Sequence, residues 1–347
     1  MKKTPFLVGI LAGDSQAGKP FVGNVALFKQ LQAKIRHQRG DAFVFTPSTI
    51  KNNRIDGFQY IQKKWIQKPF RFPDVVYNRF PFREDEVSMN WLYQLFDHHN
   101  IPFFNRHFFH KGEVYEVLRE HEMLATHLPM TKTIDSIQDV VTFIRRYPFV
   151  YIKRALSSKG DGVFKITCTA SHYFMETPND TWTIPSIQEM VDHIQPSFQT
   201  TPYIIQEGIE TDHFNGHKYD VRVYVHAFQN QFVVSGIGVR VSCAQSVTTH
   251  VPKGGKIIPF SVVSDRFNER NIKEICQHIG EALSNRYGLV GEFSVDIGRT
   301  PDGRLYIFEV NAKPMKFDEQ IIYEQGLDNL VSYFYQLTTS KRDSAFQ

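Results

Sequence analysis

The most informative part of this chain is Gly291-Glu-Phe-Ser-Val-Asp296-Ile-Gly-Arg-Thr-Pro-Asp302-Gly303-Arg-Leu-Tyr-Ile-Phe-Glu309-Val-Asn311. Two largely apolar runs flank Asp302-Gly303, which is a strong two-residue turn signal, so the stretch predicts a β-hairpin. With the turn centred there, paired residues have numbers that sum to 605, and Asp296 lies opposite Glu309. Asn311 shares the face of Glu309 because side chains alternate along a strand.

The acidic pair on this hairpin predicts half of a metal site. Like charges that face each other on a sheet are destabilising, so a cation is expected to neutralise Asp296 and Glu309. Oxygen ligands such as these and Asn311 suit Mg²⁺, which commonly bridges carboxylates to nucleotide phosphates, and Mn²⁺ is an alternative ion. The competing interpretation is a solvated hairpin face whose acidic charges are paired with nearby basic residues, namely Arg299, Arg304 or Lys313.

A second hairpin is predicted for residues 148–166, which read Pro-Phe-Val-Tyr-Ile-Lys153-Arg-Ala-Leu-Ser-Ser-Lys-Gly-Asp-Gly-Val-Phe-Lys-Ile. Its loop could turn successive N–H groups toward a phosphate and allow close approach, while Lys153 at the strand end would add a positive charge. An ordinary flexible turn with exposed lysines is the alternative. The small residues of this loop are Ser157, Ser158, Gly160 and Gly162.

Residues 202–225 predict a buried strand, a polar loop and a second strand. The first strand ends in Gln206-Glu207-Gly208-Ile209, where backbone groups that leave the sheet could hydrogen-bond an adenine edge. The second strand carries Asp220 and Arg222 on one face, although an ion pair at a strand end is common. A partner strand at residues 231–241 contains Arg240.

This order of motifs resembles the ATP-grasp superfamily. More narrowly, Pro-Phe-Val-Tyr-Ile-Lys153, Tyr219-Asp-Val-Arg222 and Glu309-Val-Asn-Ala-Lys-Pro314 resemble the YheC/YheD group of spore-coat-associated ATP-grasp proteins. The similarity covers about residues 105–320. It implies an α/β (α+β ATP-grasp) fold, in which an N-terminal open α/β sheet precedes two α+β subdomains that sandwich ATP.

The resemblance also implies roles for the individual residues. ATP would be bound through Lys111, Lys153 and the glycine loop, through the backbones of Glu207 and Ile209, and near its ribose or phosphates by Asp220. Arg222 and Arg240 would neutralise a transferring phosphoryl group or a substrate carboxylate. The implied ATP contacts are Lys111, Lys153, Ser158, Gly160, Gly162, Gln206, Glu207, Gly208, Ile209 and Asp220, and the implied Mg²⁺ ligands are Asp296, Glu309 and Asn311.

The implied activity is an ATP- and Mg²⁺-dependent ligation of a carboxylate to an amine or a thiol through an acyl phosphate. Alternatives are a spore-coat assembly protein that binds ATP without catalysis, and a phosphotransferase that acts on a hydroxyl group. The chain departs from amino-acid-ligating relatives at Lys313-Pro314-Met315, where they often have a small residue, Pro and Gly. This departure leaves the acceptor, a small molecule or a peptide, undefined.

The composition indicates which kinds of binding partner and which cellular compartment to expect. The chain has 347 residues, of which 41% are hydrophobic and 22% are charged, and a net charge of +4, with no basic block, so we expect a globular protein that does not bind nucleic acid. Three unpaired cysteines favour a reducing compartment, and no apolar run reaches the ~20 residues that span a bilayer. We therefore expect a cytoplasmic protein without a membrane segment, and the resemblance to the YheC/YheD group implies an association with the spore coat.

The expected domains follow from the pattern of apolar runs. Residues 1–105 alternate strands and helices as in an open α/β sheet, and residues 106–335 form the ATP-grasp domain. Its subdomains are expected at about 111–205 and 206–335, followed by a tail at 336–347. Two further matches are rejected: Pro20 replaces the Ser or Thr of a P-loop, and Ala125 replaces the second histidine of a zinc-protease motif.

Overall fold

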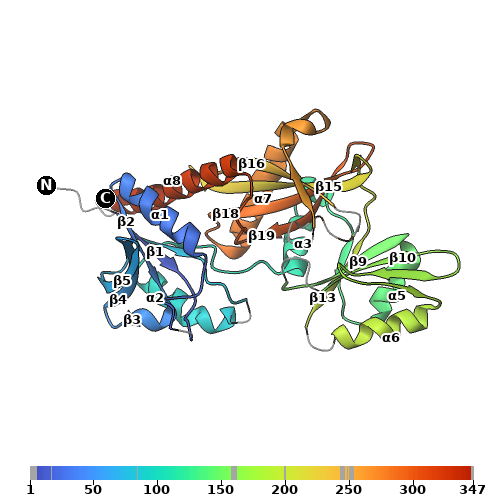
Figure 1. The fold of residues 1–347 in the computed structure, drawn as a ribbon, viewed down its shortest axis with the longest axis horizontal. Coiled ribbons are helices and arrows are strands. Elements are labelled where there is room, and N and C mark those ends of the chain that lie inside the picture. The colour runs from blue at the N-terminus through green and yellow to red at the C-terminus, as the bar shows by residue number, and fades with distance from the viewer. Residues whose placement is uncertain are drawn as a thin grey trace.

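The structure is a computed structural model that describes residues 6–16, 18–83, 85–157, 162–198, 201–242, 247, 249 and 254–344. These residues form three sheets with helices packed on them, as predicted for an α/β protein. Figure 1 shows an elongated molecule, with the N-terminal domain at one end, a subdomain built on β9 and β10 at the other, and the C-terminal sheet between them.

The N-terminal domain is a seven-stranded sheet in the order β3-β4-β2-β1-β6-β7, with β5 paired to β4. Its centre is parallel, as expected from the alternation of strands and helices. Apolar clusters cover both faces of the sheet. The elements are β1 (Leu7–Leu11), α1 (Val25–His37), β2 (Asp41–Phe45), β3 (Ile50–Lys51), β4 (Arg54–Ile61), β5 (Lys64–Phe70), β6 (Val75–Asn78), α2 (Asn90–His98) and β7 (Phe103–Phe104).

The middle subdomain is a six-stranded antiparallel sheet in the order β12-β11-β10-β9-β13-β8. Helices α5 and α6 supply the apolar side chains that pack against it. The capping box Ser136-x-x-Asp139 fixes the start of α5. The elements are β8 (Thr131–Thr133), α5 (Ile137–Arg146), β9 (Phe149–Arg154), β10 (Val163–Cys168), β11 (Tyr173–Glu176), β12 (Thr181–Ile184), α6 (Ile187–Phe198) and β13 (Tyr203–Glu207).

The C-terminal subdomain is a six-stranded sheet in the order β17-β16-β15-β18-β19, with β14 paired to β15. Helix α7 packs on one face together with α3 and α4, which precede the middle sheet in sequence but share this core. Helix α7 ends at Gly288, whose positive φ of 76° suits glycine. The elements are α3 (Lys111–Arg119), α4 (Glu122–Ala125), β14 (His213–Phe214), β15 (His217–Phe228), β16 (Gln231–Val241), β17 (Lys256–Ile258), α7 (Glu269–Tyr287), β18 (Glu292–Arg299) and β19 (Leu305–Asn311).

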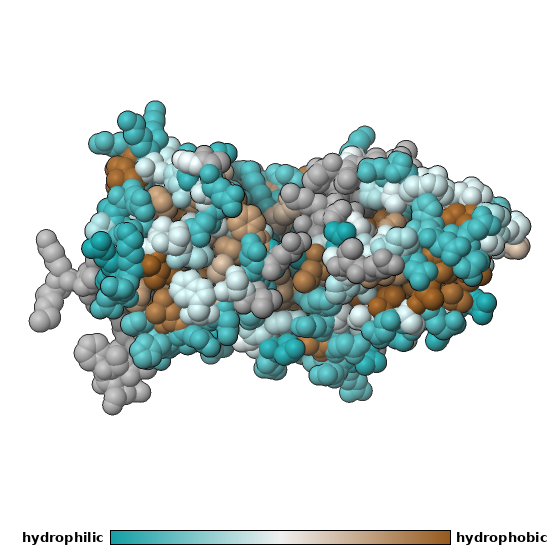
Figure 2. All heavy atoms as spheres, turned by 90° about the horizontal axis from the view of Figure 1, so that it is seen from below, coloured by the Kyte–Doolittle hydropathy of each residue, from teal (hydrophilic) through white to brown (hydrophobic). Residues whose placement is uncertain are grey.

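Helix α8 (Gln320–Ser344) packs against both the C-terminal sheet and the N-terminal domain. It lies on β15 and β16 and also packs against α1, so that its apolar side chains enter the core of the N-terminal domain. The helix includes most of the segment 336–347 that was expected to be a tail. Hydrophilic side chains cover much of the lower face of the molecule (Figure 2). Within the described residues, no helix combines the length and the apolar character needed to cross a membrane.

Candidate active site

The acidic hairpin forms with the predicted pairing but with a different turn. Asp296 lies opposite Glu309, as predicted. The predicted two-residue turn is wrong, because the Thr300 N–H donates to the Arg304 carbonyl at 2.9 Å and leaves residues 301–303 as the loop. A bulge on β19 then inserts Phe308 between the paired residues and restores the register at Glu309. The two deviations therefore cancel at the acidic pair.

Basic side chains neutralise both carboxylates of this pair. Arg240 lies 3.0 Å from Asp296 and 2.8 Å from Asp220, and Lys111 lies 3.1 Å from Glu309. Burial raises the pKa of Glu309, but the charges of Lys111 and Lys153 outweigh it and hold that pKa well below its usual value. The acidic pair therefore does not require a metal for its stability when no ligand is bound.

The cations named in the alternative interpretation have other partners. Arg299 lies 3.0 Å from Asp212, Arg304 lies 3.2 Å from Asp302, and Lys313 lies 3.4 Å from Glu86. The hairpin face is also not solvated, since Asp296 is buried and only 5% exposed. That interpretation is therefore wrong about both the partners and the exposure.

The hairpin offers oxygen atoms that fit a divalent cation. Asp296 Oδ1 is buried, makes no hydrogen bond to the described part of the chain, and lies 3.7 Å from Arg222 Nε. An unsatisfied buried carboxylate oxygen is costly unless a ligand completes it. Among the described residues, no group of three His, Cys, Asp or Glu side chains could hold a metal. Two carboxylates and the Asn311 amide are thus a partial set, as suits Mg²⁺, which keeps waters and binds phosphates.

Arg240 is buried and held by two carboxylates. Asp220 and Asp296 both contact its guanidinium group, and Thr249 donates a hydrogen bond to the other oxygen of Asp220. Burial lowers the pKa of Arg240, but the two carboxylates more than offset this and leave it above its usual value. This geometry fits a role in orienting Asp296, with Asp220 in turn holding Arg240.

Lys153 lies on β9 and faces the same region from the middle sheet. Its Nζ donates to Gln206 Oε1 at 2.6 Å, and Gln206 Nε2 donates to Thr131 at 2.9 Å. Burial lowers the pKa of Lys153 to about 8, although the nearby Glu309 charge acts in the opposite direction. No carboxylate of the described ranges lies at ion-pair distance from Lys153, which suits this lysine to receive an anionic ligand.

At the end of β13, the backbone carbonyl of Glu207 does not take part in the pairing with the neighbouring strand. The Glu207 N–H donates to the Met130 carbonyl at 2.8 Å, so this group is not available to an adenine. The Met130 N–H donates to the Glu207 carboxylate at 2.8 Å instead of to the Glu207 carbonyl. No described residue outside the strand pairings is shown donating to the Glu207 carbonyl, so it is an acceptor that the linker could offer. Gly208 donates to Phe149 at 2.8 Å, and Ile209 follows beyond the end of the strand.

The glycine loop is described only in part. Ser158 and Gly160 lie outside the described residues. Gly162 has a positive φ of 64°, and its carbonyl accepts a hydrogen bond from the Arg154 N–H at 3.1 Å where the hairpin resumes. At the other end of the loop, Lys111 donates to the Ser157 carbonyl at 2.9 Å. The loop is therefore anchored beside the Lys111–Glu309 pair.

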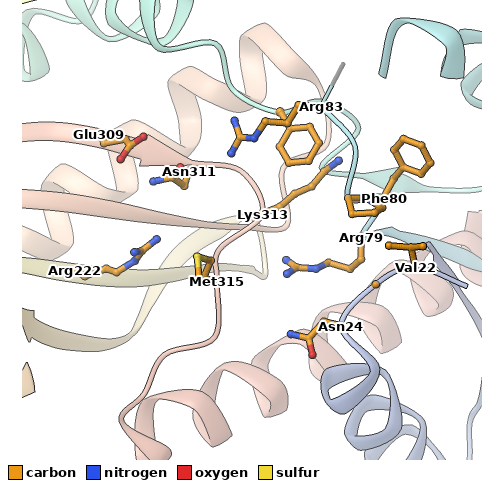
Figure 3. Close-up of a pocket in the computed structure, with 13 residues that line it drawn as sticks. Val22, Asn24, Arg79, Phe80, Arg83, Arg222, Glu309, Asn311, Lys313 and Met315 are labelled. Carbon is orange, nitrogen blue, oxygen red and sulfur yellow. The ribbon is translucent and has the colours of Figure 1, made fainter. Parts of the chain in front are cut away.

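Two cavities meet at Glu309, which lines both. The smaller, of about 40 Å³, lies between the middle and C-terminal sheets and is lined by Lys111, Gln206 and apolar residues of α3 and β19. A water molecule occupies ~30 Å³, so an adenine ring could enter only if this interface opened. The larger cavity, of about 420 Å³, lies between the N-terminal domain and the C-terminal sheet (Figure 3).

The larger cavity contains two arginines that the sequence interpretation missed. Arg79 and Arg83 follow β6, at the carboxyl end of a parallel strand. Ligands of open α/β sheets bind at that edge, so two arginines in Arg79-Phe-Pro-Phe-Arg83 were the available signal. Arg222, Glu309, Asn311 and Lys313 line the cavity from the other side. The N-terminal domain is therefore part of the site.

A buried network fixes the N-terminal domain against the C-terminal sheet. Glu292 on β18 accepts hydrogen bonds from Tyr77 at 2.5 Å and from Tyr224 at 2.8 Å, and Arg79 lies 3.1 Å from it. Burial, together with the Glu292 charge, raises the pKa of both tyrosines. Arg79 also donates to the Pro314 carbonyl at 3.1 Å. The network thus holds Arg79 at the wall of the cavity.

The YheC/D-like ATP-grasp family model matches residues 100–337. The chain belongs to this family. Two curated relatives from Bacillus subtilis (strain 168) are similar to it. The endospore coat-associated protein YheD is 28% identical over 88% of this chain and 73% of its own length. The endospore coat-associated protein YheC is 21% identical over 81% of this chain and 81% of its own length.

Solved structures of ATP-grasp proteins share the fold of this YheC/D-like chain. D-cycloserine synthetase DcsG has a TM-score of 0.59 at 12% identity and covers 95% of this chain and 99% of its own. The D-Ala:D-Ser ligase VanG from Enterococcus faecalis has a TM-score of 0.58 at 16% identity, with coverages of 95% and 99%. The ATP-grasp ligase PsnB, complexed with a variant of its minimal precursor, Mg and ADP, has a TM-score of 0.55 at 13% identity, with coverages of 96% and 99%. These likenesses concern the whole architecture, including the N-terminal domain.

Proposed function

We propose that the protein is an ATP- and Mg²⁺-dependent ligase that joins a carboxylate to an amine. One observation carries the proposal: the two cavities share Glu309 in their linings. A nucleotide that enters the smaller one as its interface opens would therefore meet a substrate in the larger one beside the acidic hairpin. Family membership and the fold shared with ATP-grasp ligases support it.

The proposed site residues form two groups, one that would bind the nucleotide and one that would bind the metal. Lys111 and Lys153 would hold the phosphates, and the Glu207 carbonyl would accept from the adenine amino group. Asp296, Glu309 and Asn311 would hold Mg²⁺, which when bound neutralises phosphate charge. The unsatisfied Asp296 Oδ1 supports this assignment.

The proposed reaction has two balanced steps. The substrate carboxylate bonds to the γ-phosphorus of ATP, and ADP leaves, giving an acyl phosphate. The amine then bonds to the acyl carbon, phosphate leaves, and the amine loses a proton. Arg222, which lines the larger cavity, would orient the carboxylate with a planar guanidinium group, while positioning and charge neutralisation supply most of the rate.

Calorimetric titration and ADP release test this function. Mg²⁺ and ATP should bind with measurable heat, and Lys153→Ala and Glu309→Ala should each abolish binding or turnover. Mass spectrometry of products formed from ATP and a cell extract should reveal an amide. Unchanged ATP affinity in both variants would reject the site, and a phosphorylated hydroxyl product would favour a phosphotransferase.

An association with the spore coat is a separate part of the proposal, supported by the names of the two Bacillus subtilis relatives. We propose that the protein acts in the cytoplasm, where ATP is supplied, and reaches the coat afterwards. A fluorescent fusion in sporulating cells should then mark the coat. Diffuse fluorescence throughout sporulation would argue against this association without affecting the ligase assignment.

A further inference from the structure

The larger cavity is strongly cationic. Its lining includes four basic side chains, Arg79, Arg83, Arg222 and Lys313, and one acidic side chain, Glu309. Its volume of about 420 Å³ lies within the ~300–1,000 Å³ typical of small-molecule sites. Because Glu309 is assigned to the metal, the charge left for a ligand depends on which of the four basic groups other carboxylates neutralise.

Two of the four basic groups already have carboxylate partners. Arg79 lies 3.1 Å from the buried Glu292, and Lys313 lies 3.4 Å from Glu86. Glu86 is fixed in turn by the Phe108 N–H, which donates to both of its carboxylate oxygens. These two pairs are formed within the protein and leave little charge for a ligand.

Arg83 and Arg222 are less compensated. Within the described part of the chain, Arg83 has no carboxylate at ion-pair distance, and its guanidinium carbon lies 4.4 Å from the centre of the Phe108 ring. Arg222 donates to the neutral Ser294 hydroxyl at 3.1 Å, and its one ion-pair contact to a described carboxylate is the long one of 3.7 Å to Asp296, which Arg240 already holds at 3.0 Å. Figure 3 shows the two guanidinium groups directed toward the same space, which Asn311 and Met315 border.

The two arginines approach this space from different domains. Arg222 belongs to β15 and lies on the side of Glu309, whereas Arg83 belongs to the loop after β6 of the N-terminal domain. A ligand with a single anionic group would satisfy one guanidinium group and leave the other without a counter-charge. A ligand with two anionic groups would satisfy both.

We propose that this cavity binds a small dicarboxylic acid, with one carboxylate at Arg222 beside the acidic hairpin and the second at Arg83. The carboxylate at Arg222 is the one that reacts. Among the described residues that line the cavity, Glu309 is the one acidic side chain that could pair with an ammonium group, so the proposed acid carries no amino group. This inference rests on the proposed ligase function and names its carboxylate substrate.

Matched diacids and monoamides test the second carboxylate. With the protein saturated by Mg²⁺ and a non-hydrolysable ATP analogue, succinate and glutarate should bind at least about tenfold more tightly than succinamate and glutaramate, which have nearly the same shape and one charge fewer. Arg83→Gln should reduce this ratio to near one. The affinity for the ATP analogue should change by less than about twofold in that variant.

Arg145→Gln is the matched control, because it removes an exposed arginine of the middle subdomain that lies outside the cavity. It should preserve the preference for diacids. Equal binding of diacids and monoamides, or no binding of either diacid while the analogue still binds, would overturn this inference and leave the ATP-dependent function standing. Failure of the unsubstituted protein to bind the analogue would overturn both.

Discussion

Lys111 Nζ lies 3.1 Å from Glu309 Oε1 and also donates to the Ser157 carbonyl at 2.9 Å. The first residue of α3 therefore links β19 to the beginning of the glycine loop. If Glu309 binds Mg²⁺, the metal competes with Lys111 for the same carboxylate. Lys111 would then be released toward the phosphates when the metal and the nucleotide arrive together.

The effect of Mg²⁺ on nucleotide affinity should depend on Glu309. Glu309→Gln keeps the shape of the side chain but removes the charge that suits a hard cation, so the enhancement of ATP-analogue binding by Mg²⁺ should fall at least about tenfold. Calorimetry with and without Mg²⁺ measures this enhancement. Glu274→Gln, at an exposed position of α7, is the control and should retain it. An unchanged enhancement in Glu309→Gln would exclude Glu309 as a ligand.

Nucleotide affinity should fall as the pH rises above 8. The pKa of Lys153 is about 8 because the amine is buried. Phosphate binds the protonated amine, so above this pKa binding requires proton uptake, and the affinity for metal-free ADP should decrease by up to about tenfold per pH unit. Below the pKa, Lys153 should contribute no pH dependence. Titrations between pH 7 and pH 9.5 measure the slope.

Lys153→Arg is the control for that slope, since a guanidinium group stays charged throughout this range. Its ADP affinity should be nearly constant between pH 7 and pH 9.5. The same slope in both proteins would assign the titration to a different group.

Gly208→Ala should destabilise the protein because the added methyl group would clash with one aromatic ring. A Cβ atom at this position would lie 2.0 Å from Cδ2 of Phe149 in β9. Overpacking of this kind costs about 1–3 kcal/mol, which urea unfolding measures. In the Phe149→Ala background, Gly208→Ala should cost much less. An equal cost in both backgrounds would show that the Phe149 ring is not the obstacle.

Glu292→Gln should be more destabilising than Tyr77→Phe. The first change leaves Arg79 buried without its carboxylate, which costs about 3–5 kcal/mol. The second removes one hydrogen bond to a carboxylate that keeps Tyr224 and Arg79, which costs about 1–3 kcal/mol. Denaturant midpoints of both variants provide the comparison. If Glu292→Gln were the milder change, the Arg79–Glu292 contact could not be the main interaction of this network.

The sequence predicted those parts of the site that depend on the period of a strand. Asp296 was placed correctly opposite Glu309 because an error in the turn and an unforeseen bulge at Phe308 cancel. The hairpin β4–β5 was not predicted, because the apolar residues of Arg54–Ile61 do not alternate strictly: Ile55 and Phe58 are three residues apart. The roles assigned to the predicted site residues remain predictions.

Contacts between domains could not be predicted in the same way. Arg79 and Arg83 belong to no motif, and only the packing of the N-terminal domain on β18 and β15 brings them to Glu309. The resemblance implies that Arg240 neutralises a phosphoryl group or a substrate carboxylate, but it did not indicate the contacts with Asp220 and Asp296 that the structure shows. Local patterns carry little information about such long-range partners.

The path of α8 limits where this polypeptide can be shortened. Leu327, Leu330 and Phe334 belong to a cluster that also includes residues of β1, α1, β2 and β6. Removing the last helix would expose an apolar face on a domain that ends more than 200 residues earlier in the chain, so an isolated N-terminal fragment should aggregate. During synthesis, that first domain can complete its interior only after the final helix has emerged, which makes its folding one of the last events instead of the first.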